Sequence, residues 1–494
     1  MTTTTTRTKA RKPASKTKAK TQPKTQPKTQ PKTQAKTQAK TQAKTQARTK
    51  ARAARKAGDR LVRTRPIRRL DPAAGIRTVD DLADHLYVAA QVELSTIPMY
   101  LFSAYSIRTR GHSQWAAPRG VLRTLVGISI EEMLHLALVR NLMVAIGYGE
   151  DISFYDEEFI PSYPSTMLNR YNPDDPDGPE IILSLDRLSK EHVNTFRRVE
   201  MPDDIDLGAE TFARHPRDVG QYTSLGEFYR AIEQGFIDLE DEIEWAVEDA
   251  RKQYKRGFWN EFGNGKPIRV HDLATARQAL RIIIEQGEGT ITDHKKIEIR
   301  PGVEDYTHYE KFVRVQEGIE GIGAVDGGPE HRIDIDDPEA TWPVVADPLV
   351  ADFDDQPGVQ SLMTLFNAAY CYTLCLLDET YAHSTDDVKT KKVPGTDREE
   401  MFSHRYRLER NDVAVMQGIL YPIAQALVTT PIPDGPYKGR HAAPSFQFYD
   451  FDADEQERTK KEQLIDLCAE AIEHFPVLGG PDGVERQIRL LVDI

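Results

Sequence analysis

Glu93, Glu132 and His135 have the residue types and the spacing of metal ligands. Glu132 and His135 stand three positions apart, and residues at that spacing share one face of a helix, so both can reach one ion. Both glutamates interrupt stripes of apolar residues at helical spacing, where a buried carboxylate needs a cation or hydrogen bonds to offset the cost of its burial. Glu131 is a weaker candidate, because its direction on the helix differs by about 100° from that of Glu132.

The two helices that carry these residues are predicted at 78–110 and 118–147. Pro98 lies inside the first helix and should bend it close to Glu93. Glu93 lies 17 residues before the end of the first helix, and Glu132 lies 14 residues after the start of the second. At about 1.5 Å per residue, both carboxylates are about 20 to 26 Å from the connecting turn, so an antiparallel hairpin places them at the same level. A buried polar network without metal is the alternative.

A second pair of helices is predicted after about 75 residues rich in Asp, Pro and Tyr. One begins at Ser224 and ends before Gly257, and the other covers 272–300 and contains Glu285 and Glu288. Ferritin-like bundles have one such long crossover between their helix pairs, and they bind metal through Glu and Glu-x-x-His on facing helices. The predicted fold class is therefore mainly α, a ferritin-like four-helix bundle with additional C-terminal helices.

Five ordered segments mark this predicted bundle. They are 91–100 (QVELSTIPMY), 131–135 (EEMLH), 225–229 (LGEFY), 285–289 (EQGEG) and 308–312 (HYEKF). Together they resemble the ferritin-like domain of the iminophenyl-pyruvate dimer synthases, enzymes of violacein- and rebeccamycin-type bisindole pathways, over about residues 78–325. The resemblance continues more weakly over 416–448. It implies one or two bound iron ions (Fe2+/Fe3+) and the oxidative coupling of two imines derived from an aromatic amino acid.

Carried over position by position, the resemblance implies a set of metal ligands and names no further catalytic residue. The ligands are Glu93, Glu132, His135, Glu227, Glu285, Glu288 and His308. Glu227 has another interpretation, because Ser224 and Glu227 also form a capping-box pattern that would use Glu227 to begin a helix. If the carboxylates of the second hairpin also lie at equal distances from its turn, then Glu240 or Glu244, and not Glu227, would face Glu285.

The fourth predicted helix departs from the di-iron pattern, because it has Glu285-x-x-Glu288 where Glu-x-x-His is expected. The resemblance implies that His308 supplies the missing nitrogen, and a surface histidine is the alternative. The dimerising enzymes of this family are about twice as long and carry a haem-associated region that this sequence does not show. We therefore expect non-haem iron and no haem.

The chain divides into a basic N-terminal segment and an acidic remainder. Residues 1–70 hold 23 Lys and Arg and one acid, Asp59, and the whole chain has a net charge of −12, so the remainder carries −34. Repeats of Pro-Lys-Thr-Gln and Ala-Lys-Thr-Gln over 22–46 leave no apolar face to bury, which predicts a disordered tail. Its charge suits contact with nucleic acid or another polyanion. A solubilising tail is the alternative.

The rest of the predicted organisation is a bundle at 71–325, an acidic linker or covering loop at 326–357, and a helical region at 358–494. Helices are expected there at 359–382, 411–428 and 454–474. Three cysteines are too few for a disulfide framework, and Cys371 and Cys375 are expected in the core. No apolar stretch reaches about 20 residues and none begins the chain, which predicts a cytoplasmic protein without a membrane span or secretory signal.

These expectations predict a non-haem iron oxidoreductase of specialised metabolism whose substrate is a small aromatic imine or another amino-acid-derived molecule. Iron held by carboxylates and imidazole keeps open positions for dioxygen, peroxide or substrate. Two other functions fit the sequence. One is a non-catalytic iron-binding or storage protein with many ions per subunit, and the other is a nucleic-acid-associated protein anchored by the tail. Oligomerisation is compatible with all three.

Overall fold

The computed structural model of the chain describes residues 70, 72–108, 120–168, 181–202, 222, 224–247, 249–255, 267–287, 297–300, 303–319, 332–384, 389–392, 395, 399–454 and 456–494. The predicted basic tail, except for Leu70, lies outside these residues, as does the predicted ligand Glu288. Within the described ranges, no helix is long and apolar enough to cross a membrane.

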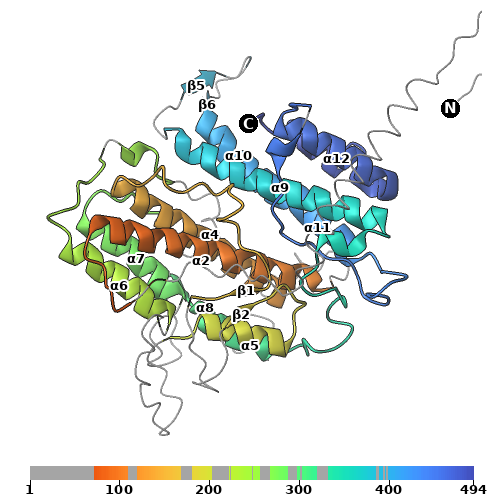
Figure 1. Cartoon of the computed structure of the whole chain (residues 1–494), viewed down its shortest axis with the longest axis horizontal. Helices are drawn as coiled ribbons and strands as arrows, with labels where there is room; N and C mark the ends of the chain where they lie inside the picture. The colour runs from red at the N-terminus through yellow and green to blue at the C-terminus, as the bar shows by residue number, and fades with distance from the viewer. Residues whose placement is uncertain are drawn as a thin grey trace, which may run out of the picture. The chain divides into compact units, whose positions relative to one another are not determined.

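The first two helices of the bundle pack side by side as the predicted hairpin (Figure 1). α2 (Val79–Ser106) begins where the sequence predicts, because the Thr78 hydroxyl accepts the N–H of Asp81 and the Asp81 carboxylate accepts the N–H of Thr78. α4 (Val121–Ala145) follows. Pro98 lies inside α2, and most residues of both helices are buried.

The second pair of the bundle is α6 (Leu225–Asp238) and α7 (Leu273–Gly287), which pack against each other. The prediction that the third helix continues towards Gly257 is wrong, since α6 ends at Asp238. Acids are frequent over 238–244. Negative charge at the C-terminal end of a helix opposes its dipole, which favours termination there.

The fourth helix is also shorter than predicted. The expectation that it reaches residue 300 is wrong, because β3 (Ile297–Arg300) is a strand that pairs antiparallel with β4 (Val303–Asp305). Isoleucine alternates with charged residues over 297–300, and Pro301-Gly302 follows, a pattern typical of a short hairpin.

The long crossover contains short elements that the sequence pattern did not predict. β1 (Ser165–Thr166) pairs antiparallel with β2 (Ile182–Leu183). Further along, α5 (Lys190–Val199) packs against α8 (His308–Gln316), which follows the β3–β4 hairpin. α8 also contacts α4 and α7, so the end of α5 and the start of α8 reach the bundle near the middle of α4.

The C-terminal region is helical, as predicted. It contains α9 (Pro357–Ala382), the strand pair β5 (Lys389–Lys392) and β6 (Glu399–Phe402), α10 (His404–Val415), a π-helical turn (Met416–Leu420), α11 (Tyr421–Val428), α12 (Lys460–His474) and α13 (Val484–Leu490). Single-turn 3-10 helices lie at Asp249–Arg251, Val350–Phe353, Phe451–Ala453 and Pro476–Leu478. Cys371 and Cys375 are free and buried in the core of α9, where the sequence placed them.

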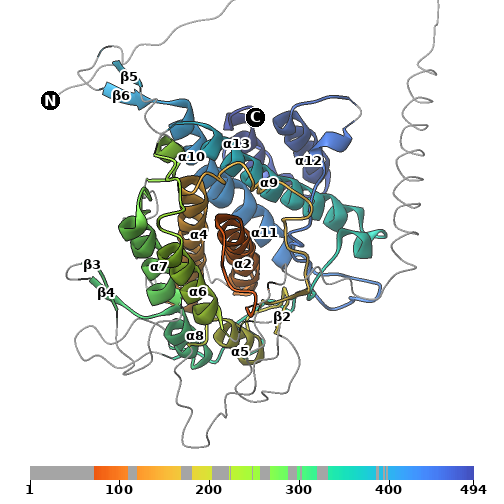
Figure 2. The ribbon, with the colours of Figure 1, turned by 60° about the vertical axis from the view of Figure 1, so that its left-hand side comes forward.

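α2 is the most enclosed helix of the bundle. Figure 2 shows it end-on, with α4, α6 and α5 on one side and α11 on the other. Gln425 of α11 donates a hydrogen bond to the carbonyl of Tyr105, at the end of α2. Since the C-terminal helices cover the side of α2 that faces away from the bundle, nearly the whole helix is buried. The predicted fold class is confirmed.

Candidate metal centre

The structure brings together Glu93, Glu132 and His135, the three ligands predicted from residue spacing. Nδ1 of His135 lies 3.5 Å from Oε2 of Glu93 and 3.6 Å from Oε2 of Glu132. All three side chains are at most 4% exposed. The level matching of α2 and α4 therefore produces the expected proximity, and the carboxylates and the imidazole face each other inside the bundle.

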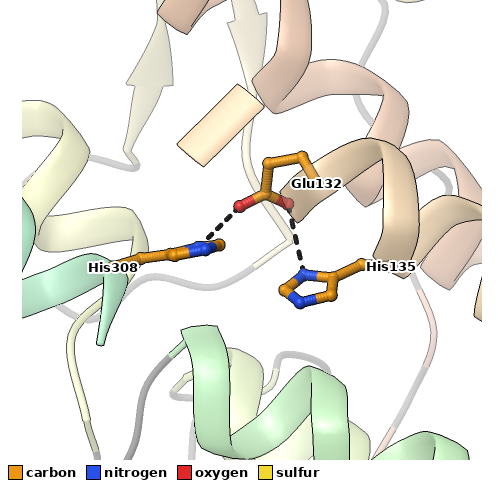
Figure 3. A group of neighbouring side chains, drawn as sticks. All are labelled: Glu132, His135 and His308. Carbon is orange, nitrogen blue, oxygen red and sulfur yellow. Dashed lines mark ion pairs between the residues drawn. The ribbon is translucent and has the colours of Figure 1, made fainter. Parts of the chain in front are cut away.

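His308, the first residue of α8, faces the same carboxylate from the opposite side. Its Nδ1 lies 2.8 Å from Oε1 of Glu132 and 3.7 Å from Oε2 of Glu200, the residue that directly follows α5. Figure 3 shows Glu132 between the two imidazoles, with one carboxylate oxygen directed at each ring. One ligand atom from each of Glu132, His135 and His308 lies within 4.8 Å of the others. These three residues could therefore hold a metal ion.

Two buried atoms at the centre of this group have no hydrogen-bond partner in the described structure. They are Oε1 of Glu132 and Nδ1 of His308, which lie 2.8 Å apart but are not aligned for a hydrogen bond with each other. Leaving a buried polar atom without a partner costs about 1–3 kcal/mol. A cation between the two atoms would satisfy both, so the residues fit a metal ion.

The second nitrogen of each imidazole has a buried acceptor. Nε2 of His308 lies 2.8 Å from Oε2 of Glu131, and Nε2 of His135 lies 3.0 Å from Oε1 of Gln286 on α7. We assign an N–H to both Nε2 atoms, because a carboxylate or amide oxygen can only accept. This tautomer leaves a lone pair on both Nδ1 atoms, and an acceptor behind the ring is the usual arrangement for metal-binding histidines.

Two tyrosines hold the outer carboxylates. The hydroxyl of Tyr229 on α6 donates to Oε1 of Glu93, and the hydroxyl of Tyr100 on α2 donates to Oε1 of Glu200 at 2.6 Å. In both pairs the other oxygen, Oε2, faces a histidine Nδ1. Each carboxylate is therefore fixed by one oxygen and offers the other to the centre of the site.

Without a bound cation, the electrostatics of the site favour the protonated forms of Glu93 and His135. Burial raises the pKa of Glu93 to about 8, and the charge of Glu132 acts in the same direction. Burial alone would lower the pKa of His135, but hydrogen bonds to Glu132 and Glu93 outweigh it and raise that pKa to about 10. Protonated imidazoles in turn hold the pKa of Glu132 well below its usual range, against the effect of burial. These shifts favour protons on Glu93 and His135 at neutral pH when no cation is bound.

A small cavity of about 20 Å³ lies beside the site. Its walls are Val92, Glu93, Thr96, Glu132, His135, Glu200, Leu225, Tyr229, Ile283, Ile284 and Gly287. A cavity needs about 10–15 Å³ to hold one water molecule. The space therefore suits ions and small oxidants, and an aromatic ring does not fit without movement of α6 or α7.

Two predicted ligands that the structure describes, Glu285 and Glu227, are not brought into this group. Glu285 is 54% exposed and faces Arg281 on the outside of α7, because the inward position of that turn belongs to Gln286. Glu227 is half-buried in the first turn of α6, where its N–H donates to the hydroxyl of Ser224. Glu288 lies outside the described residues. The alternatives to Glu227 are not brought in either, since Glu240 and Glu244 are exposed beyond the end of α6.

Two further glutamates lie close to the predicted ligands. Glu131, the weaker ligand candidate, is 4% exposed and contacts both His308 and Lys311, because α8 packs against the face of α4 that Glu131 occupies. The sequence did not predict Glu200. Glu200 lies in the crossover, where its signal is a carboxylate directly after the amphipathic segment that ends with Phe196 and Val199.

Comparison with known proteins agrees with this fold. Residues 86–317 match a family model described as Ferritin-like. A ferritin-like protein from Caulobacter vibrioides has a solved structure that is 22% identical, covers 62% of this chain and 89% of its own, and gives a TM-score of 0.39. The match to the family model shows that the chain contains a ferritin-like domain, and the inward side chains of this domain form the candidate metal centre.

Two curated relatives extend beyond that domain. Dichlorochromopyrrolate synthase from Lentzea aerocolonigenes is 27% identical over 414 residues, which are 75% of this chain and 36% of the relative. The 2-imino-3-(indol-3-yl)propanoate dimerase from Chromobacterium violaceum is 26% identical over 416 residues, 76% of this chain and 34% of the relative. The resemblance to bisindole-pathway dimer synthases is confirmed, and the chain spans about a third of the length of these relatives.

Proposed function

We propose that this protein is a non-haem iron oxidoreductase with two metal positions bridged by Glu132. Glu93 and His135 complete one position, and Glu200 and His308 complete the other. The observation that carries the proposal is the pair of buried atoms, Oε1 of Glu132 and Nδ1 of His308, which face each other at 2.8 Å in the centre of the group and have no hydrogen-bond partner in the described structure. The separation between the carboxylates and imidazoles leaves room for cations, which would replace the protons that these groups otherwise hold.

The donor atoms favour iron or a similar transition metal. Imidazole nitrogen together with carboxylate oxygen suits iron, and such sites keep open coordination positions for dioxygen or peroxide. The chain contributes the rest of the chemistry. Gln286 and Glu131 fix the imidazoles, Tyr229 and Tyr100 fix the carboxylates, and burial excludes bulk water from the site.

The two curated relatives support a substrate class. Their names describe a synthase of dichlorochromopyrrolate and a dimerase of an indolyl imino acid. We infer that this chain acts on an aromatic 2-imino acid or a related amino-acid-derived molecule in specialised metabolism. Because the cavity of about 20 Å³ has no room for an aromatic ring, the substrate needs a separation of α6 from α7, whose Leu225, Ile283 and Ile284 form its apolar wall.

A non-catalytic iron protein is the second candidate, and the small volume of the cavity favours it, since storage requires no organic substrate. Metal analysis with an optical spectrum of the aerobically purified full chain separates the two. An oxidoreductase should contain one or two irons per chain and no haem band, and many ions per chain indicate storage. A protein that takes up no metal would refute both.

The reaction class is tested with the iron-loaded full chain and several aromatic 2-imino acids, generated in situ by an amino-acid oxidase. The expected result is metal-dependent consumption of dioxygen or peroxide and a coupled product. A matched reaction with metal-free protein is the control. Absence of any metal-dependent product with every imine would leave the iron-binding protein as the better description.

A further inference from the structure

Two charged residues of the sequence motifs have no role as ligands in the proposed site. Glu131 precedes Glu132 in EEMLH, and Lys311 lies within HYEKF. In the structure they form a buried ion pair, with Nζ of Lys311 at 2.9 Å from Oε1 and 2.7 Å from Oε2 of Glu131. Lys311 is 6% exposed and Glu131 is 4% exposed. A buried ion pair is costly to desolvate and is rarely a source of stability by itself, so its position calls for another explanation.

The ion pair continues directly into the metal site. Oε2 of Glu131 accepts the Nε2–H of His308 at 2.8 Å, and the Nδ1 of the same ring faces Glu132. The carboxylate of Glu131 therefore lies between the ammonium group of Lys311 and the imidazole of His308, with both of its oxygens within 2.9 Å of Nζ of Lys311. An ionised carboxylate in this place puts an anion behind the imidazole, and Lys311 offsets part of its charge.

His135 lacks such an arrangement. The acceptor behind its ring is the neutral amide of Gln286, at 3.0 Å from Nε2. The two imidazoles are otherwise alike, since both are fully buried, both offer Nδ1 to Glu132, and their rings stack at 5.4 Å with an angle of 29°. The two metal positions therefore differ in the charge that stands behind their histidines.

We infer that Glu131 and Lys311 act as a pair of positioning residues that set how strongly His308 donates electron density to its metal ion. The inference rests on the proposed metal site. An anion that accepts the Nε2–H strengthens donation from Nδ1, because it stabilises positive charge on the ring. A cation beside that anion weakens the effect. Glu131 and Lys311 should therefore change the properties of the bound ion in opposite directions.

Effects of opposite sign from Glu131 and Lys311 on the bound ion would distinguish this role from a purely structural one. If the ion pair only fastened α8 to α4, loss of either partner would loosen His308 and would affect the bound metal in the same way. The test uses the full chain loaded with Fe2+ under anaerobic conditions. Its variants are Glu131→Gln, Lys311→Met, the double variant and Lys311→Arg. The readouts are the midpoint potential from a spectroelectrochemical titration, the Fe2+ dissociation constant from calorimetry, and the helical content from circular dichroism.

Glu131→Gln leaves the cation of Lys311 buried behind the site and removes the anion. We expect Fe2+ at the His308 position to bind about 10- to 100-fold more weakly, the range typical for loss of such a partner, and the midpoint potential to rise. Lys311→Met leaves the anion uncompensated, so the potential should fall and Fe2+ should bind at least as tightly as in the wild type. The double variant should lie between the two, and Lys311→Arg should restore wild-type values.

The outcomes distinguish this inference from the proposed function. Shifts of the same sign in Glu131→Gln and Lys311→Met, or no shift in either, overturn the inference while the iron site stands. A wild-type protein that binds no iron overturns the proposed function and the inference together. If Lys311→Met loses its helical content, Lys311→Gln provides a second variant that removes the charge and keeps a polar side chain, and the same opposite signs are required of it.

Discussion

Oε1 of Glu132 and Nδ1 of His308 lie 2.8 Å apart in the interior of the bundle, and neither has a hydrogen-bond partner in the described structure. The other oxygen of Glu132 faces Nδ1 of His135 at 3.6 Å. One carboxylate thus faces the imidazoles of His135 and His308, two residues that are 173 positions apart in the chain. This relationship defines the candidate site and gives the most direct prediction.

Replacing Glu132 with Gln should remove most of the bound metal. The amide keeps the volume and the hydrogen-bonding capacity of the side chain but removes the charge that balances the cation and the oxygen that would bridge two positions. The measurement is metal content per chain after equilibration with Fe2+ and desalting. Circular dichroism should show the same helical content in the variant.

Glu285→Gln is the matched control for that experiment. Glu285 is a predicted ligand, but its side chain is 54% exposed on the outside of α7, so its replacement should leave metal content unchanged. Equal metal retention in the Glu132 and Glu285 variants would show that the site does not depend on Glu132. Loss of metal from the Glu285 variant would instead show that α7 presents this residue to the site when metal is bound.

Tyr229→Phe should weaken binding at the position formed by Glu93 and His135. The variant removes only the hydroxyl that donates to Oε1 of Glu93, and loss of such a supporting hydrogen bond typically costs about 10- to 100-fold in metal affinity. Tyr100→Phe is its counterpart, since Tyr100 donates to Glu200 at the other position. Calorimetry that resolves two binding events should show a different event affected in each variant. The same event affected in both would contradict two separate positions.

The period of the apolar residues predicted α2, α4 and three residues of the candidate site. The family resemblance implied His308, and nothing in the sequence pattern predicted Glu200. Glu93, Glu132 and His135 lie on long helices, where the period of the apolar residues gives both the direction and the level of each side chain. Glu200 and His308 lie at the ends of short helices, α5 and α8, and only tertiary packing carries them to α4. No periodic pattern reports such a position.

At α7 the resemblance implied Glu285 as a ligand, but the structure directs the neighbouring Gln286 inward, as the acceptor for His135, and leaves Glu285 exposed. Residues on neighbouring positions of a helix differ by about 100° in direction, so a small error in the assumed helix axis exchanges an inward with an outward side chain. The family motif could not correct this, because a motif identifies a segment and does not state which of its side chains face the metal.

Removing residues 1–70 should leave metal content and the thermal midpoint essentially unchanged. The segment is rich in Lys, Thr and Gln and has no pattern of apolar residues that could contribute to the core. Binding to DNA or another polyanion, where the full chain shows it, should disappear with the segment and weaken steeply with salt. A large loss of metal or of thermal stability on truncation would show that the segment takes part in the fold.

The last prediction concerns pH, and its sign follows from the protons that the metal-free site holds. The pKa of His135 is raised from 6.5 to about 10, and that of Glu93 from 4.5 to about 8. The folded metal-free protein therefore binds more protons than the unfolded chain between about pH 6.5 and 8, and its stability falls as pH rises through that window.

Metal binding has the opposite dependence on pH, because the ion must displace these protons. Each proton displaced makes binding about tenfold tighter per pH unit. The gap in thermal midpoint between metal-loaded and metal-free protein should accordingly widen from pH 6 to pH 8, as measured by differential scanning calorimetry at constant free metal. Glu93→Gln lacks one of the titrating groups, so its gap should widen less steeply with pH. A gap that stays constant or narrows over this range would show that the ions do not replace protons on these side chains.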